Sequence, residues 1–294
     1  MSYRSDNDLL SRILNGMHLR AEVFAHADYC GVWRLDTSGS GKAAFHLIGR
    51  GACWLHLPSH DGPLPLNAGD LVLFPRDAKH EIRARPDHGG SDSTTTVLCG
   101  FLDFGKTPHN PVLDALPDVV HIPAEDAVDS GAITNTTRLI FAEARKVGPG
   151  RQILLDRLSE ALFVLLLRHV LQTTENQRGF LAALSDHRLA NALDAMHREP
   201  GARWTVHSLA REASMSRTAF SVAFSGRVGM PPMQYLTQLR LRLAGGMLQS
   251  GTSVTTVANQ VGYGDETSFR RAFKRFFGVG PGEVKRGRLE QPGA

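Results

Sequence analysis

The chain has 294 residues, of which 42% are hydrophobic and 21% charged. This composition excludes a disordered chain, and the length exceeds what one hydrophobic core usually supports, so two domains are expected. Met1–Gly16 lacks the apolar run of a signal peptide, and the longest dense apolar stretch, Ala161–Leu167, is far shorter than the ~20 residues of a membrane span. We therefore expect a cytoplasmic protein with no membrane partner, whose three cysteines are thiols or ligands rather than disulfides.

The charge is unevenly distributed along the chain. Residues 185–294 contain fifteen Lys and Arg but eight Asp and Glu, a net charge of +7, whereas residues 1–184 have a net charge of −3. A basic part next to a mildly acidic part favours a polyanionic partner for one domain. Charge that serves solubility alone would give the same numbers, so this observation leaves both interpretations open.

Residues 20–104 have the pattern of short β-strands. Runs rich in β-forming residues are separated by turn sequences such as Asn67-Ala68-Gly69-Asp70. The clearest runs are Ala43–Ile48, Ala52–Leu57, Leu71–Phe74 and Thr96–Phe104. Many short strands at this spacing predict a small antiparallel barrel or sandwich.

From about Asp126 the pattern becomes helical. Gly131–Val147 is one predicted helix, and Arg151–Gln172 is a second. The second has apolar residues on more than one side, which indicates burial by the barrel or by a second subunit. Residues 173–184 form the expected linker, and short helices follow.

An internal repeat with an offset of about fifty residues identifies the organisation of the C-terminal part. Each copy contains a small apolar pair, two phenylalanines four residues apart, then glycine and proline. The first copy has Leu209-Ala210, Ala213, Phe220, Phe224, Gly229 and Pro232, and the second has Val257-Ala258, Val261, Phe269, Phe273, Gly278 and Pro281. The distance from the first alanine to the first phenylalanine is ten residues in one copy and eleven in the other, a difference that a turn can absorb.

Each copy is predicted to be a helix-turn-helix unit. Thr205 and Ser216 are expected N-caps in the first, and Ser253 is the expected cap in the second. The buried phenylalanines leave the opposite face of each second helix for DNA bases and phosphates. The residues expected to face DNA are Arg217, Thr218, Ser221 and Val222 in the first unit and Glu266, Thr267, Arg270, Arg271 and Lys274 in the second. Two helical hairpins with a solvated cationic face are the alternative, which the duplication and the short turns disfavour.

The segment from Val257 through Ser268-Phe269-Arg270-Arg271-Ala272-Phe273-Lys274-Arg275-Phe276-Phe277-Gly278 to Pro281 closely resembles the signature of AraC/XylS-type regulators. The resemblance covers roughly residues 187–290. It implies a bi-lobed domain in which a helix over Met233–Leu248 holds two recognition helices in successive major grooves. Acidic residues at 265 and 266 depart from the basic character of the second helix, where they could read a cytosine amine or cap the helix.

The N-terminal part resembles a cupin barrel of the kind found in one AraC-type subgroup. The resemblance rests on Leu66–Pro75 followed by His80, and on Phe45–Ile48 with Gly51–Trp54. The predicted fold is therefore α+β, with a cupin-like antiparallel barrel over residues 1–125, a helical dimerisation region over 126–184 and a double helix-turn-helix domain over 185–294. Cupin enzymes hold their metal with a His-x-His, a Glu and a later His, and only His80 has a counterpart here.

A different group of residues suggests a metal or thiol site. Cys30, His46, His80 and Cys99 lie in or beside predicted strands, and alternation along the strand places His46 on the same face as Ile48. Two thiolates and two imidazoles suit structural zinc. The alternative is that all four are core residues, and Cys53 is expected to be plain core.

Three functions are compatible with these features. The first is a one-component regulator that binds promoter DNA as a homodimer, contacts RNA polymerase as an activator, and responds to a small molecule, a metal or an oxidant. The second is a cupin-type metalloenzyme fused to a DNA-binding module, which the missing His-x-His disfavours. The third is an architectural or antagonist protein that binds DNA without sensing anything.

Overall fold

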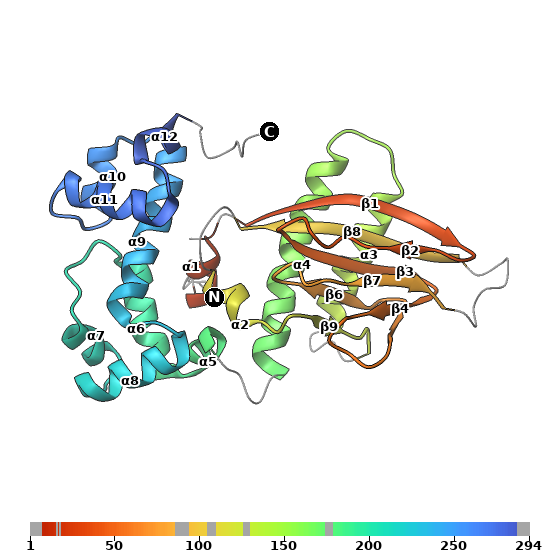
Figure 1. The fold of residues 1–294 in the computed structure, drawn as a ribbon, viewed down its shortest axis with the longest axis horizontal. Helices are drawn as coiled ribbons and strands as arrows, with labels where there is room; N and C mark the ends of the chain where they lie inside the picture. The colour runs from red at the N-terminus through yellow and green to blue at the C-terminus, as the bar shows by residue number, and fades with distance from the viewer. Residues whose placement is uncertain are drawn as a thin grey trace, which may run out of the picture. The chain divides into compact units, whose positions relative to one another are not determined.

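The structure is a computed structural model that describes residues 8–15, 17, 19–85, 94–104, 110–125, 130–173 and 179–286. The described residues form two compact units (Figure 1). One, the sensor unit, contains those within 19–103 and 116–175, and the other, the helical unit, contains those within 1–18, 104–115 and 176–294. No helix among the described residues is long and apolar enough to cross a membrane.

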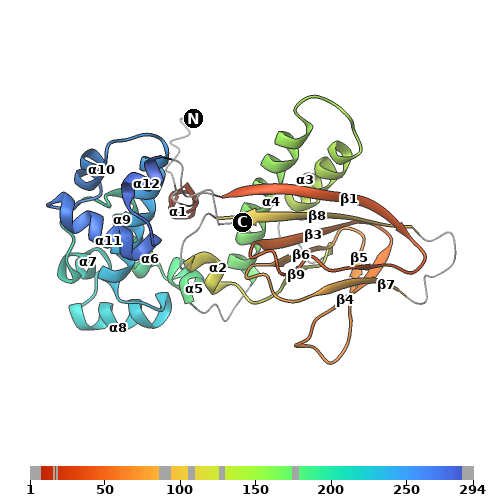
Figure 2. The ribbon, with the colours of Figure 1, turned by 45° about the horizontal axis from the view of Figure 1, so that its top comes forward.

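The sensor unit contains two antiparallel sheets, which confirms the predicted β-fold (Figures 1 and 2). The five-stranded sheet has the order β1 (Arg20–Cys30), β8 (Thr94–Asp103), β3 (Ala43–Arg50), β6 (Leu71–Phe74) and β9 (Val120–Ile122). The four-stranded sheet has the order β2 (Arg34–Leu35), β7 (Glu81–Ala84), β4 (Ala52–His56) and β5 (Leu64–Asn67). Apolar residues of both sheets, among them Ile48, Leu55, Phe74 and Ile82, form one buried cluster.

Both faces of the five-stranded sheet are covered, so its central strands β3 and β6 are buried over consecutive residues. On β3, Ala44 and Ile48 belong to the buried cluster shared by the two sheets. Phe45 alternates with them and lines a cavity beneath the helix that follows the barrel. The strand opposite Phe45 has Gly100, where a Cβ atom would lie 2.3 Å from the Phe45 ring. Only glycine leaves room for the aromatic ring at this position.

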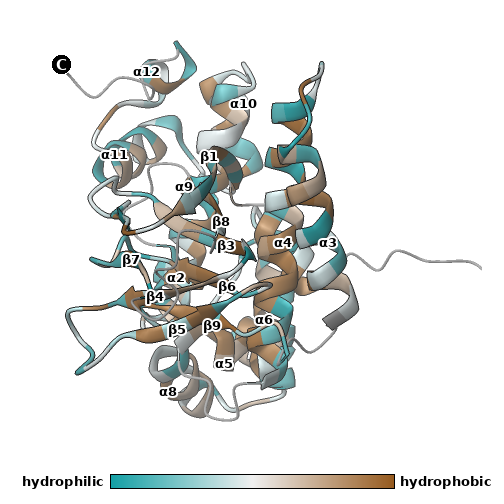
Figure 3. Cartoon of the chain, turned by 90° about the vertical axis from the view of Figure 1, so that its right-hand side faces the viewer, coloured by the Kyte–Doolittle hydropathy of each residue, from teal (hydrophilic) through white to brown (hydrophobic). Residues whose placement is uncertain are grey.

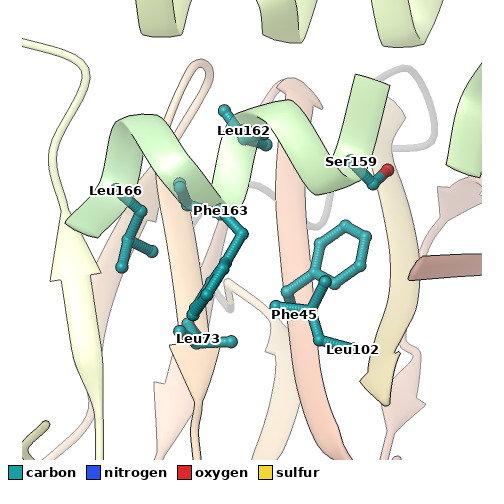
Figure 4. Close-up of a pocket in the computed structure, with 8 residues that line it drawn as sticks. Phe45, Leu73, Leu102, Ser159, Leu162, Phe163 and Leu166 are labelled. Carbon is teal, nitrogen blue, oxygen red and sulfur yellow. The ribbon is translucent and has the colours of Figure 1, made fainter. Parts of the chain in front are cut away.

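Two helices after the barrel form a hairpin, α3 (Ser130–Ala144) and α4 (Arg151–Thr173). Both predicted helices are confirmed, although α3 ends three residues before Val147. α4 packs on β1, where a bulge between Val23 and Ala25 leaves backbone groups without ladder partners. The Gln152 amide donates to the Val23 carbonyl (3.0 Å), and Asp156 accepts from the Val23 amide (3.3 Å). Figure 3 shows that α4 is hydrophobic along much of its length, as a helix lying on a sheet must be, and Figure 4 shows apolar side chains of α4 directed at that sheet.

The helical unit contains ten helices within the described ranges. They are α1 (Leu9–Asn15), α2 (Pro111–Ala115), α5 (Gly179–Ser185), α6 (His187–Arg198), α7 (Val206–Glu212), α8 (Arg217–Val228), α9 (Pro232–Gln249), α10 (Val254–Gln260), α11 (Glu266–Phe277) and α12 (Pro281–Lys285). The boundaries 1–125, 126–184 and 185–294 do not coincide with the two units, because α1 packs on α6 and α2 packs on α5. Arg12 of α1 forms an ion pair with Asp194 of α6. Two short helices within the predicted barrel region, α1 and α2, are therefore part of the helical unit.

Candidate nucleic-acid interface and buried sensor cluster

Side-chain caps fix where the helices of both helix-turn-helix units begin. Thr205 and Ser208 form a capping box at α7, and the Ser216 hydroxyl accepts from the Ala219 amide at the start of α8. In the second unit Ser253 caps α10 and the Asp265 carboxylate caps α11. The N-caps predicted at Thr205, Ser216 and Ser253 are confirmed. Asp265 has the capping role that was one of its two predicted alternatives.

The turns of the two units have the same geometry except for one inserted residue. Ser214 (φ +51°) and Gly262 (φ +80°) each follow the C-cap in a left-handed conformation. The next amide then bonds back to the equivalent alanine carbonyl, from Met215 to Ala210 (2.8 Å) and from Tyr263 to Ala258 (2.9 Å). Three residues separate the caps in the second unit and two in the first, so the extra residue of the repeat lies in the turn.

The phenylalanine pairs pack in the same way in both units. The rings of Phe220 and Phe224 have centroids 5.4 Å apart at 54°, and those of Phe269 and Phe273 are 5.5 Å apart at 54°. All four side chains are fully buried. α9 connects the two lobes, because its first half buries Leu236 in one lobe and its second half contributes Leu241, Ala244 and Leu248 to the other. Eighteen residues make this helix about 27 Å long.

The side chains predicted to face DNA lie opposite the buried phenylalanines. On α8, Arg217, Thr218 and Val222 are exposed and Ser221 is half-buried; on α11, Thr267, Arg270, Arg271 and Lys274 are exposed and Glu266 is half-buried. Val222 has 70% of its surface exposed and is the large apolar side chain on the open face of α8. Both faces are therefore open for contact with a nucleic acid.

Glu266 is the centre of a small polar network at the start of α11. Its carboxylate accepts from the Thr255 hydroxyl of α10 (2.5 Å) and from the Arg270 guanidinium (2.7 Å). These two partners lower the pKa of Glu266. Arg270 is thus held on the exposed face of α11, with part of its donor capacity occupied by Glu266.

A buried polar cluster lies between the two sheets of the sensor unit. His46 of β3 is directly opposite Cys99 of β8, and its Nδ1 lies 3.1 Å from the Cys99 Sγ. The His46 Nε2 lies 3.0 Å from the Nε2 of His80, and the Thr37 hydroxyl is within 3.1 Å of both nitrogens. His46, His80 and Cys99 are at most 1% exposed. The inward direction predicted for His46 is confirmed.

Hydrogen-bond directions in this cluster follow from one carbonyl. The His80 Nδ1 lies 2.7 Å from the Ala78 carbonyl, which can only accept, so His80 donates there and its Nε2 accepts. The proton between the imidazoles then belongs to His46, and the Cys99 thiol donates to the His46 Nδ1. Burial, with a contribution from His80, lowers the pKa of His46 to about 3, and burial raises the pKa of Cys99 to about 12. All these groups are therefore neutral near pH 7.

Thr37 is a member of this cluster that the sequence did not reveal. It lies in the Gly/Ser-rich segment Asp36–Lys42, which has no periodic pattern and no His-x-His motif. The Asp77 carboxylate accepts from the amides of Gly39 (3.1 Å) and Gly41 (2.6 Å) and so fixes this segment over the histidines. The residue that positions Thr37 is therefore Asp77, which lies about forty residues later in the chain and comes near only on folding.

The predicted quartet of Cys30, His46, His80 and Cys99 does not come together. Cys30 is exposed at the end of β1, beside Thr94, whereas Cys99 lies opposite Ala25. Five strand residues separate these positions, about 16 Å, which exceeds the reach of a shared metal or a disulfide. Cys99 and His80 also contact opposite nitrogens of His46, so they do not face a common point. Among the described residues, no group of three or more His, Cys, Asp or Glu could hold a metal ion.

The chain matches two known protein families. The cupin family matches residues 8–172, and a helix-turn-helix domain family matches residues 209–287. The HTH-type transcriptional regulator AlkR of Acinetobacter baylyi is 31% identical over 300 residues, which cover 93% of this chain and 97% of that protein. The chain belongs to the AraC-like transcription regulators. A member from Streptomyces lividans is 29% identical over 299 residues, covering 95% of this chain and 97% of its own.

The chain is also similar to a second regulator and, more distantly, to a solved structure. The RCS-specific HTH-type transcriptional activator RclR of Escherichia coli is 30% identical over 283 residues, covering 95% of this chain and 97% of its own. The crystal structure of ToxT from Vibrio cholerae matches 91% of this chain and 97% of its own, with a TM-score of 0.37 and 12% identity. In this AraC-like regulator α8 and α11 occupy the position of recognition helices, and the cupin fold carries the His46–Cys99 cluster.

Proposed function

We propose that this AraC-like protein is a one-component regulator that acts in the cytoplasm and binds promoter DNA with both α8 and α11. The observation that supports the proposal best is the duplicated helix-turn-helix geometry on one connecting helix, with capped and open recognition faces in both lobes. Contact with RNA polymerase, which would make the protein an activator, is part of the same proposal.

The connections of the chain support a route from sensor to DNA. β1 and β8 are paired neighbours, and Arg20 at the start of β1 is the register partner of Asp103 at the end of β8. α1 precedes β1 and α2 follows β8, and both helices pack within the helical unit. The chain therefore joins this strand pair to two helices of the helical unit, one of which is held by the Arg12–Asp194 ion pair, and we propose this covalent connection as the route by which the state of the sensor unit affects DNA binding.

We propose that the protein is a homodimer and that the α3–α4 hairpin forms the contact. Large apolar side chains on a surface favour association. Leu139, Val147, Ile153 and Leu154 are all exposed here, between 44% and 103%. Leu139→Asp together with Ile153→Asp is expected to shift the protein from dimer to monomer in analytical ultracentrifugation.

The nature of the signal is a separate question from DNA binding. In the cluster of Thr37, His46, His80 and Cys99 the two imidazoles and the thiol are neutral and buried, which suits a structural element better than an oxygen-activating enzyme site. An oxidant would reach the exposed Cys30 first. The separation of Cys30 from Cys99 leaves the predicted zinc quartet without a common point, and elemental analysis of anaerobically purified protein tests whether any zinc is bound.

Footprinting of the full chain on its promoter tests the DNA-binding proposal. The recognition helices α8 and α11, which α9 connects, are expected to protect two major-groove segments about 10 base pairs apart on one face of the duplex. A single short footprint would show that one lobe does not engage DNA. Equal affinity for promoter and random DNA would favour the architectural alternative.

A further inference from the structure

The two lobes of the helical unit touch at a second place besides α9. The turn over residues 199–205 joins α6 to α7 in the first lobe, and the turn over residues 261–265 joins α10 to α11 in the second. The two turns meet backbone to backbone. A Cβ atom on Gly262 would lie 2.5 Å from the Gly201 carbonyl oxygen, and a Cβ atom on Gly201 would collide with the Gln260 carbonyl oxygen. Glycine at both positions is therefore what allows so close an approach.

Arg240, near the middle of α9, bonds to the same turn of the first lobe. Its Nε donates to the Pro200 carbonyl (2.7 Å), and its Nη2 donates to the Ala202 carbonyl (2.8 Å). A Cβ atom on Gly262 would lie 3.0 Å from the Arg240 Nη2, so the guanidinium also lies against the turn of the second lobe. One half-buried side chain thus contacts both turns at the point where they meet.

The turn that Arg240 holds has a shape fixed by its own hydrogen bonds. The Glu199 carbonyl accepts from the Ala202 amide (3.1 Å) and from the Trp204 indole (2.8 Å). The Trp204 amide donates in turn to the Ala202 carbonyl (2.8 Å). The position of Gly201 therefore follows that of the first lobe.

The turn of the second lobe sets the direction of α11. Its Tyr263 amide bonds back to the Ala258 carbonyl of α10 (2.9 Å), and its Asp265 carboxylate caps α11. A single connecting helix can curve between its ends, and bending of α9 would change the separation of α8 from α11. A second attachment, placed directly before α11, removes that freedom.

We propose that Arg240 is a positioning residue, which together with the Gly201–Gly262 contact fixes α8 relative to α11 and so sets the spacing of the DNA segments that the protein accepts. The fixed separation of the two helices stands alone, whereas its consequence for DNA rests on the proposed function. One added base pair moves the second segment by about 3.4 Å and turns it by about 35° around the duplex axis. Hydrogen bonds do not tolerate such a displacement, and fixed lobes cannot follow it.

The distance between the recognition helices is measurable without DNA. Spin labels at Val222→Cys on α8 and Lys274→Cys on α11 report it by double electron–electron resonance in the full chain with Cys30→Ser, whose other cysteines are buried. We expect one narrow distance distribution. Arg240→Met keeps the aliphatic chain but removes both hydrogen bonds, and it is expected to broaden the distribution.

Gly201→Ala tests the backbone contact independently of Arg240. Gly201 does not have a positive φ, so alanine suits its backbone conformation. Non-bonded carbon atoms normally lie about 3.5–4.0 Å from their neighbours, so the two turns have to separate by about 1 Å or more. This variant is expected to shift the mean distance between the labels.

Arg151→Met and Gly282→Ala are the matched controls. Arg151 also donates to a carbonyl, that of Ala144 in the sensor unit (2.7 Å), and the Cβ position of Gly282 has open space around it. Both controls are expected to keep the narrow distribution. An unchanged distribution in either folded test variant, or an equal change in the controls, would overturn the proposal.

Duplexes with one base pair added or removed between the two footprinted segments test the consequence for DNA. The parent is expected to bind them about 5- to 150-fold more weakly than the original spacing, which is the loss of one base contact. Arg240→Met is expected to reduce this penalty at least about 5-fold, because a lobe that can move recovers such a contact. An equal penalty in parent and Arg240→Met would overturn the proposal.

The distance measurement and the footprints separate this inference from the proposed function. Changed distances in the variants, without specific footprints by the parent, would retain the fixed helices and reject the regulator. Specific footprints with unchanged distances would retain the regulator and reject this inference.

Discussion

Replacing Arg271 or Arg270 by alanine, one at a time, distinguishes the contributions that these two exposed arginines of α11 make to DNA binding. In the free protein Arg270 is bonded to Glu266 (2.6 Å), and this ion pair is substantially exposed. Such an exposed pair contributes little to stability, but DNA binding at Arg270 has to break it or share the guanidinium with it. A base contact contributes about 1–3 kcal/mol. Arg271→Ala is therefore expected to weaken promoter binding about 5- to 150-fold, and Arg270→Ala by less.

Fluorescence anisotropy at several salt concentrations identifies the kind of contact. Loss of a base contact lowers promoter affinity and leaves random-sequence DNA unaffected. Loss of a phosphate contact weakens both and reduces the slope of log K against log salt by about 0.9. Arg157→Ala is the control, because Arg157 is an exposed arginine paired with Glu160 in the sensor unit. Parent-like binding by both α11 variants would show that the recognition helix is misassigned.

Gly262→Ala is expected to destabilise the second lobe by about 1–3 kcal/mol in calorimetry, because φ is +80° and the new Cβ would lie 2.5 Å from a backbone carbonyl. Ser214→Gly, at the equivalent position, is expected to be neutral or stabilising, and the reverse order would contradict the turn geometry. His46 has a folded-state pKa of about 3, below its unfolded value of about 6.5, so its neutral form is the stable one. Its contribution is complete above pH 6.5 and is lost as the pH falls towards 3, by up to about 1.4 kcal/mol per unit; equal Tm values at pH 7 and pH 5 would refute this. In native protein a thiol reagent is expected to modify Cys30 quickly and Cys99 only on unfolding, which mass spectrometry after limited labelling measures.

Local signals made the helix-turn-helix domain predictable. Hydroxyl caps at Thr205, Ser216 and Ser253 act within three residues of sequence, so they are readable without a fold. The repeat made the pairing of helices into two equivalent units predictable, because the same spacing of phenylalanines occurs twice. α1 and α2 were not predictable in the same way. They are seven and five residues long, and their place in the helical unit depends on packing against α6 and α5.

The sensor cluster shows where strand patterns stop being informative. Alternation placed His46 on the inner face, which the structure confirms. It could not place Cys30, because the relation between Cys30 and Cys99 depends on the register of β1 with β8. That register puts Cys30 at the exposed end of an eleven-residue strand. Thr37 was missed because a loop held by Asp77 has no periodicity to read.

The two recognition helices differ in charge and polarity, so we expect them to make different kinds of contact within one binding site. α11 has Arg270, Arg271, Lys274 and Arg275, whereas α8 has Arg217 and Arg227, and the latter is paired with Asp186. Phosphate attraction depends on cations, so α11 is expected to account for most of the salt dependence. α8 instead exposes Val222, and an apolar side chain in a major groove can recognise the methyl group of thymine. Sequence-independent affinity for DNA would then arise mainly at α11, and α8 would contribute mainly to the recognition of base sequence.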